Sequence, residues 1–358
     1  MRVLIAWAND SSVNLGVRAL ARGSEDLVRS VWPDAEFTHL NYGRRQPEVP
    51  WSPRALVRER LTGRLGMQRW LRGFDLVWDT RSGDSFADIY GLTRHTTMSL
   101  LNEFAAQAGV PVIMAPQTIG PFHTRRGRLL ARRNLRRSTL VFARDSVSAA
   151  ASADLGRPVA AVTSDLVFGI DQPAPAPVTR DVLLNVSGLL WEDNPHVDAD
   201  RYRAAIRRII DELLAGGRAV TLFPHVLDSQ NHDNDVPVSR ALAAEYDGRV
   251  DLVVPNDLED ARSVIAASEL VIGARMHACL NALSTGTPAV AMAYSRKFAP
   301  LMKAVGWDHV VSITEEGEWA DAVLGHASSP ELRSQAEAAR DKGRALLEPL
   351  VAGLKTSL

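Results

Sequence analysis

Arg275 and His277 place a cation and a titratable side chain where core packing explains neither. They follow an apolar strand expected at residues 270–272, and they begin a helix expected at residues 276–283. A guanidinium pairs with two oxygens of a carboxylate or phosphate, and histidine titrates near neutral pH. Ligands of open parallel sheets bind outside the carboxyl ends of the strands. The pair therefore predicts an anion-binding and acid–base site; the alternative is that it only caps the helix.

A loop rich in carboxylates follows another expected strand. Asp79, Asp84 and Asp88 lie within residues 78–91, together with Gly83. Carboxylates in such a loop bind sugar hydroxyls or accept a proton as a general base. An Asx turn followed by a helix cap is the alternative explanation. Asp84 and Asp88 are therefore candidates for base catalysis and substrate binding.

Four further candidate positions lie near expected strand ends. Asn14 and Gly16 open the first helix, where unbonded N–H groups and a tight turn favour an anion or a polar ligand. Gln117 ends a strand just before a Gly-Pro turn, and His225 closes another strand in the second half of the chain. Each is a candidate substrate-binding residue, and each has a structural alternative as part of a turn or cap.

Arg144 directly follows an expected strand at the start of a helix that Asp145 could cap. A guanidinium at a helix N-terminus opposes the helix dipole, so an anionic partner is expected beside it. Arg144 is therefore a further candidate substrate-binding residue.

The composition is that of an ordinary soluble globular protein. The 358 residues are 46% hydrophobic and 23% charged, and the net charge of −1 gives no reason to expect a nucleic acid partner. The one cysteine, Cys279, is expected to be a small buried hydrophobe. No apolar stretch is long enough for a membrane span or a signal peptide, so a cytoplasmic protein is expected. No set of residues resembles a metal site, and we expect no metal or other cofactor.

Short apolar runs alternate with helical patterns, which is typical of parallel sheets covered by helices. Strands are expected at residues 3–8, 37–41, 76–79, 112–115, 140–143, 160–163, 182–186, 219–223, 252–254, 270–272, 289–293 and 310–313. Helices are expected at residues 16–31, 96–108, 125–137, 147–154, 199–215, 258–267 and 276–283, with a closing helix at 330–350.

A proline-rich segment at residues 171–180 separates two such series. Prolines favour an extended connector. We therefore predict an α/β protein with two Rossmann-like domains facing across a cleft, at residues 1–172 and 173–358, the second including the closing helix. The closing helix is expected to pack back toward the first domain.

Residues 123–138 contain seven arginines in a helical pattern. A solvated helix face is one explanation. The alternative is contact with an anionic membrane surface or an acidic partner, which would place the protein at the inner face of the membrane.

Taken together and in order, these segments resemble the polysaccharide pyruvyl transferase family, and the similarity runs through most of the chain. The matching pieces are Asn14-x-Gly16 with Ala19 and Leu20, Gly83-Asp84-Ser85-Phe86, Gln117-Thr118-Ile119-Gly120-Pro121, Ala143-Arg144-Asp145 with Ser148, and Ala274-Arg275-Met276-His277-Ala278.

The resemblance implies a GT-B-like fold and transfer of the enolpyruvyl part of phosphoenolpyruvate to sugar hydroxyls. The product would be a pyruvate ketal or, in some members, an enol ether. Arg275 and His277 resemble the family's donor-binding motif, and Arg144 resembles a further donor ligand. Family members often carry an acidic pair after Asn-x-Gly, where this chain has Val17 and Arg18. That departure suggests a different acceptor sugar.

On this hypothesis His277 protonates the donor's methylene carbon, and Asp84, Asp88 or His225 takes a hydroxyl proton. The acceptor is a sugar or a lipid-linked saccharide. Two alternatives stay open: a nucleotide-sugar glycosyltransferase or epimerase of the same fold, and a sugar-binding homologue without catalysis.

Overall fold

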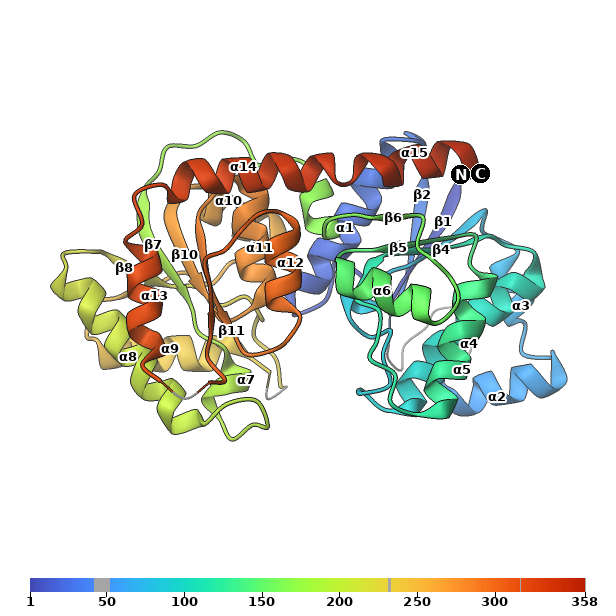
Figure 1. The fold of residues 1–358 in the computed structure, drawn as a ribbon, viewed down its shortest axis with the longest axis horizontal. Helices are drawn as coiled ribbons and strands as arrows, with labels where there is room; N and C mark the ends of the chain where they lie inside the picture. Colours follow the sequence, from blue (N-terminus) through green and yellow to red (C-terminus); the bar gives the residue numbers. More distant parts are fainter. Residues whose placement is uncertain (42–51, 231–232, 316, 358) are drawn as a thin grey trace. The chain divides into compact units, whose positions relative to one another are not determined.

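Two six-stranded parallel sheets, each covered by helices, make up the protein (Figure 1). The computed structural model describes residues 1–41, 52–230, 233–315 and 317–357. The first sheet has the order β2-β1-β3-β4-β5-β6 and the second β12-β11-β10-β7-β8-β9. The expected alternation of strands and helices is confirmed, and the fold is the two-domain Rossmann-like α/β fold of the GT-B type.

All twelve expected strands are present, with ends that differ from the expectation by at most two residues. The first sheet contains β1 Arg2–Ala6, β2 Glu36–Leu40, β3 Leu76–Asp79, β4 Val112–Gln117, β5 Leu140–Ala143 and β6 Ala161–Val162. The second contains β7 Arg180–Asn185, β8 Val220–Leu222, β9 Asp251–Leu252, β10 Ser268–Gly273, β11 Ala289–Ala293 and β12 Val310–Ser312. Central strands such as β3 and β11 are buried at every position, because helices cover both faces of a parallel sheet.

The helices up to residue 170 are α1 Leu15–Arg29, α2 Pro53–Thr62, α3 Met67–Leu71, α4 Leu92–Ala108, α5 Arg125–Arg137 and α6 Ser146–Asp154, with 3-10 turns η1 Arg81–Gly83 and η2 Leu166–Gly169. The later ones are α7 Gly188–Trp191, α8 Ala199–Ala215, α9 Asp235–Glu245, α10 Leu258–Ala266, α11 Met276–Thr285, α12 Phe298–Ala304, α13 Trp319–Ala327, α14 Leu332–Ala345 and α15 Glu348–Ser357. Among the described residues, none of these helices is both long and apolar enough to cross a membrane.

The expectation of one closing helix at residues 330–350 was wrong. Two helices, α14 and α15, occupy this region, and the second continues to Ser357. Pro349 is the second residue of α15. Proline has no N–H to donate to the carbonyl four residues earlier, at Ala345, but it fits the first turn of a new helix, so α14 ends there and α15 begins.

The chain divides into two compact units. The first comprises Met1–Asp10, Leu20–Ile170 and Arg344–Leu358, and the second comprises Ser11–Ala19 and Asp171–Gly343. Each unit contains one sheet. A domain boundary between residues 172 and 173 stays a prediction from the sequence.

Each sheet has a point where its strand order reverses. In the first sheet it lies between β1 and β3, and in the second between β7 and β10. Loops that leave adjacent strands there go to opposite faces, which opens a crevice at the carboxyl ends where ligands bind in this fold class. The candidate site residues gather near these two points.

Candidate functional site

Arg275 leaves the carboxyl end of β10 and is the N-cap residue of α11. Its backbone N–H donates to Oδ1 of Asn185, the last residue of the neighbouring strand β7, at 2.9 Å. α11 is buried along most of its length and ends at Gly286, whose positive φ of 81° suits glycine. The side chains of Arg275 and His277 are thus set by a rigid strand and a packed helix.

Two carboxylates hold the guanidinium of Arg275. Nη2 lies 2.7 Å and Nε 3.1 Å from Oδ1 of Asp235, and Nη1 lies 2.5 Å from Oδ1 of Asp233. Burial opposes the charge of Arg275, but these carboxylates outweigh that effect and raise the pKa of Arg275 above its usual range. Core packing did not explain Arg275 from the sequence, yet its side chain is buried, and it is buried against this acidic pair.

Asp235 connects Arg275 to the surrounding loops. Its Oδ1 also accepts from the N–H of Gly188, and its Oδ2 accepts from the N–H groups of His225 and Val226. The amide of Asn185 donates to the same Oδ2 at 3.2 Å. These hydrogen bonds fix the carboxylate of Asp235, which in turn keeps Arg275 in one orientation.

His225 lies in the same cluster and is uncharged at neutral pH. Burial, and then the nearby charge of His277, lower the pKa of His225 to about 3. Asn281 has its oxygen 3.1 Å from a guanidinium nitrogen of Arg262, so its amide nitrogen is the atom 3.1 Å from Nε2 of His225. Nε2 of His225 therefore accepts a hydrogen bond, and its proton is on Nδ1.

His277 is half-buried and packs on Gly16. A Cβ built on Gly16 would lie 2.6 Å from Nδ1 of His277. Asn14 accepts a hydrogen bond from the N–H of Gly16, and the N–H of Leu15 donates to the carbonyl of His225. The second unit thus brings Asn14, Gly16, His225, Arg275 and His277 together.

Val17 and Arg18 stand where the resembled family often carries an acidic pair. The side chain of Arg18 bonds the loop just before it. Its Nε donates to the carbonyl of Ser12 at 2.5 Å.

The other candidates lie in the first unit. Arg144 is fully buried; its Nη1 lies 2.5 Å from Oδ2 of Asp165, and its Nε and Nη2 donate to Oγ1 of Thr118. The anion expected beside Arg144 is thus found, and it is a carboxylate of the chain itself. Gly83 lies close by, because a Cβ built there would come within 3.1 Å of Nη1 of Arg144.

Asp84 and Asp88 differ in their surroundings. Asp88 is buried, and its oxygens accept from the N–H groups of His123 and Thr124 and from the hydroxyl of Thr124, the cap of α5. Burial raises the pKa of Asp88, but these hydrogen bonds prevail and hold it below its usual value. Asp84 is half-buried and accepts from the hydroxyl of the exposed Tyr90 at 2.8 Å.

Gln117 is fully buried at the end of β4. Its amide nitrogen donates to the carbonyls of Asp79 and Ala115. The side chain thus ties β4 to the end of β3, next to the loop that carries Asp84.

Left-handed backbone is concentrated at the reversal point of the first sheet. Trp7, Arg81 and Ser82 have φ values of 70°, 48° and 50°, which non-glycine residues adopt at a cost of about 1 kcal/mol or more each. The hydroxyl of Ser82 donates to the carbonyl of Trp7 at 2.8 Å, joining the two strained segments. Such strain is typical of functional loops, and Asp84 follows directly.

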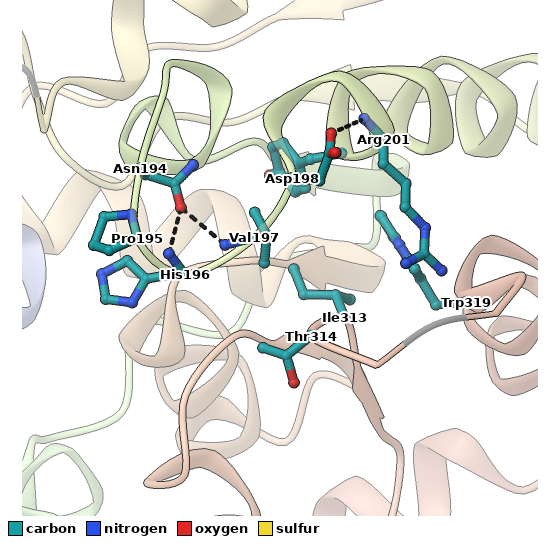
Figure 2. A pocket seen from close by; sticks show the side chains of 10 residues that line it. Asn194, Pro195, His196, Val197, Asp198, Arg201, Ile313, Thr314 and Trp319 are labelled. Carbon is teal, nitrogen blue, oxygen red and sulfur yellow. Dashed lines mark hydrogen bonds between the residues drawn. The ribbon is translucent and has the colours of Figure 1, made fainter.

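Two pockets lie at the carboxyl ends of the outer strands of the second sheet, and Thr314 lines both. One, of about 290 Å³, lies between the loop before α8 and the segment after β12 (Figure 2). Asn194 shapes that loop by accepting hydrogen bonds from the N–H groups of His196 and Val197. The other, of about 600 Å³, is lined by residues that follow β11, including Tyr294 and Ser295.

The residues that anchor the arginines were not identified from the sequence. They are Asn185, Asp233 and Asp235 around Arg275, and Asp165 beside Arg144; Asn281, which bonds His225, was also missed. Asn185 did carry a signal, as a polar residue that closes an apolar strand. Within the part of the chain that the structure describes, no three His, Cys, Asp or Glu side chains gather as metal ligands.

Two solved structures illustrate the similarity of the fold. MnaA from S. aureus, in a structure with UDP, has a TM-score of 0.60 and 16% identity, and the alignment covers 99% of this chain and 96% of that one. UDP-GlcNAc 2-epimerase from Methanocaldococcus jannaschii has a TM-score of 0.59 and 12% identity, with 99% and 100% covered. At these identities the likeness shows the fold alone.

Sequence comparison identifies the family. The amylovoran biosynthesis protein AmsJ of Erwinia amylovora is 24% identical over 267 residues, which are 68% of this chain and 62% of that protein. The chain thus matches about three-fifths of the length of this relative. The family model described as polysaccharide pyruvyl transferase matches residues 14–296, a range that contains every candidate residue above. The chain therefore belongs to the polysaccharide pyruvyl transferase family.

Proposed function

We propose that this protein transfers the enolpyruvyl group of phosphoenolpyruvate to two hydroxyls of a saccharide, free or lipid-linked, forming a pyruvate ketal and releasing phosphate. The observation that carries this proposal is the cluster of Arg275, His277 and His225 at the strand-order reversal of the second sheet. A cytoplasmic location, where phosphoenolpyruvate is made, is part of the proposal.

The donor binds at Arg275 and the start of α11. Phosphoenolpyruvate carries a carboxylate and a phosphate, and both suit a guanidinium fork and the N–H groups at a helix N-terminus. Asp235 is buried and held by several donors, whereas the side chain of Asp233 is 45% exposed. An incoming anion therefore displaces Asp233 from Nη1 of Arg275 and leaves Asp235 in place. Arg144 is proposed as a second donor ligand because it matches the arginine of the family's Arg-Asp motif, although its partner Asp165 is buried.

His277 acts as the acid. It protonates the methylene carbon of the donor, and the acceptor's first hydroxyl oxygen bonds to the adjacent carbon. The bond to the phosphate oxygen then breaks with its electron pair, and the second hydroxyl oxygen takes the vacated position. One of the two hydroxyl protons replaces the proton that His277 gave to carbon, and the other leaves with the phosphate.

Asp84 is the proposed base. The oxygens of Asp88 already hold the start of α5, and Nε2 of His225 already accepts from Asn281. Asp84 is half-buried on the loop that follows β3, just after the strained residues Arg81 and Ser82, so its carboxylate lies where a sugar hydroxyl can approach. Asn14 and Gly16 set the position of His277, and Gln117 positions the Asp84 loop.

The acceptor sugar is proposed to occupy the two pockets that Thr314 joins. Gly273 of β10 pairs with Ala291 of β11, so Tyr294 follows β11 beside the position where Arg275 follows β10. The pockets offer aromatic rings from Tyr294 and His196, whose centroids lie 5.3 Å apart, and hydroxyls such as Ser295. Aromatic faces with mixed polar groups suit a sugar ring.

The test is incubation with phosphoenolpyruvate and a panel of glycosides, reading phosphate release and the gain of one pyruvyl group by mass spectrometry. We expect both for the native protein, and strong losses for His277→Asn and Arg275→Lys. Arg240→Lys, an exposed arginine in an ion pair with Asp228, is the matched control. Release of nucleotide from a sugar nucleotide instead would favour a glycosyltransferase or epimerase. Saccharide binding without turnover would favour a non-catalytic homologue.

A further inference from the structure

Positive charge is concentrated on two segments of the first unit. Residues 53–72, which include α2 and α3, contain six arginines and one glutamate, and α5 contains seven arginines and no acidic residue. These 33 residues carry a net charge of +12 in a chain whose total is −1, so all the others together carry −13. An ordinary solvated surface mixes both signs of charge, so this local excess of positive charge indicates a binding surface.

Few carboxylates neutralise this charge. The one acid of residues 53–72, Glu59, is buried and accepts from the N–H groups of Leu65 and Met67. On α5, Arg133 and Arg137 pair with Glu103 of α4. The other five arginines of α5 are exposed and have no acidic partner among the described residues: Arg125, Arg126, Arg128, Arg132 and Arg136.

Large apolar side chains are exposed between these arginines. On α2, Val57 is 53% and Leu61 81% exposed, and on α5 Leu129 is 68% exposed. Val57 and Leu61 lie one helical turn apart on the side of α2 that carries Arg54. Leu129 has Arg125 and Arg132 one turn away on either side. Isolated exposed leucines are common, but leucines set into arginine rows on two helices form an amphipathic surface.

α2 and α5 belong to one surface of the first unit. Both pack on α4, the long helix between them in the chain (Figure 1). The core side of α5 is formed by Ala131, Asn134 and Leu135, and that of α2 by Leu56 and Glu59. The arginines and exposed leucines are therefore on the sides that α4 leaves uncovered.

We propose that the outward faces of α2 and α5 dock on a bilayer containing anionic phospholipids. The guanidinium groups meet the lipid phosphates, while Leu61, Val57 and Leu129 enter the boundary between headgroups and acyl chains. A nucleic acid or an acidic protein would use the charges but leave these apolar side chains in water. The docking does not depend on the transfer reaction, although it would hold the enzyme beside a lipid-linked acceptor.

The experiment is sedimentation of the full chain with vesicles of phosphatidylcholine, with and without phosphatidylglycerol. Binding is expected only with the anionic lipid, and it should weaken steeply as salt is added. Neutralising three arginines, in R125Q/R128Q/R132Q, should lower the partition coefficient on the order of 100-fold, since each basic residue near such a surface contributes roughly fivefold. L61S/L129S should also weaken binding, without any change of charge.

The matched control is R22Q/R240Q/R340Q, which removes the same charge from arginines of α1, α9 and α14 and should bind like the native chain. Thermal melts check that each variant is folded. Vesicle binding that ignores phosphatidylglycerol, or that L61S/L129S leaves unchanged, overturns the proposal. So does tighter binding to single-stranded DNA or a soluble acidic polysaccharide than to the anionic vesicles.

Discussion

Gly16 packs directly against the imidazole of His277: a Cβ at position 16 would lie 2.6 Å from Nδ1 and 2.7 Å from Cγ of that ring. Real Cβ atoms do not come so close, so even one methyl group must displace the histidine. Two turns about 260 residues apart, Asn-x-Gly and Arg-x-His, thus together fix the position of the His277 side chain.

G16A should therefore lower turnover by roughly 100-fold, the effect expected when a catalytic group is moved by about an ångström. G325A is the matched control, because Gly325 also lies in a helix but no heavy atom lies within 4 Å of a Cβ built there. G325A should keep full activity and gain about 0.5–1 kcal/mol of stability. Equal activity of G16A and native protein in phosphate release would show that the position of His277 is unimportant.

Replacing Asp233 should tighten donor binding. If phosphoenolpyruvate displaces this half-exposed carboxylate from Arg275, D233N removes a competitor that contributes about 1 kcal/mol, and the KM for the donor should fall about fivefold. D228N, at a similarly exposed aspartate paired with Arg240, should leave the KM unchanged. A higher KM in D233N would mean that Asp233 supports the donor site rather than occupying it.

The Arg275–Asp235 pair should be coupled in stability as well as in function. R275M leaves the fully buried carboxylate of Asp235 without its cation, which should cost about 3–5 kcal/mol. Adding D235N should recover part of that loss, because the uncompensated charge disappears. R208M, at an exposed pair with Asp321, should cost less than about 1 kcal/mol. Chemical denaturation of the single and double variants measures these terms, and simple additivity would contradict the coupling.

Acid should destabilise the fold through two buried histidines. Burial, and then the charge of Arg81, lower the pKa of His95 to about 4, and burial lowers the pKa of His225 to about 3. Between pH 6.5 and those values the unfolded chain binds protons that the folded chain does not, so the free energy of unfolding falls as pH falls. The slope reaches about 1.4 kcal/mol per pH unit for each histidine.

Chemical denaturation from pH 7 to pH 4 tests this prediction. H95Q retains an N–H donor for the carbonyl of Gly127, which the imidazole Nε2 reaches at 3.1 Å, but it cannot titrate in this range. Its stability should therefore change less steeply with pH than that of the native protein. Parallel curves for the two proteins would assign the acid sensitivity to other groups.

Filling the pockets that Thr314 joins should impair the acceptor and spare the donor. T314W should raise the KM for the saccharide at least tenfold, because the tryptophan would remove saccharide contacts that contribute about 1.4 kcal/mol or more to binding. The KM for phosphoenolpyruvate should stay the same. T139W, at an exposed threonine in the first unit, controls for the added tryptophan. An unchanged saccharide KM in T314W would place the acceptor elsewhere.

The sequence predicted the two sheets well because parallel strands are buried on both faces and read as apolar runs; β3, β5 and β11 have the predicted ends. Helices that begin with or contain proline were missed. α2 begins at Pro53, and α9 and α12 carry Pro237 and Pro300 in their first turns. Proline reads as a turn in a sequence, yet it is compatible with a helix start.

The site residues chosen from the sequence stay a prediction, and the residues that hold their side chains in place were not identified. Arg275 and Asp235 are 40 positions apart, and no local pattern links a cation to a carboxylate at that distance. The neutrality of His225 depends on complete burial and on Asn281, which are properties of the folded core. The sequence pattern can indicate which side chains are candidates for chemistry. Their charge states depend on contacts between residues far apart in the chain, which form only on folding.

The position of the single thiol has a practical consequence. Cys279 is fully buried in α11, its Sγ lies 3.5 Å from the carbonyl of Gly273, and burial raises its pKa to about 12. Thiolate is the reactive form, so a thiol reagent in neutral buffer should modify the chain only when the second unit opens. The rate of labelling of Cys279 therefore measures how often the unit that carries Arg275 and His277 opens, without an engineered probe.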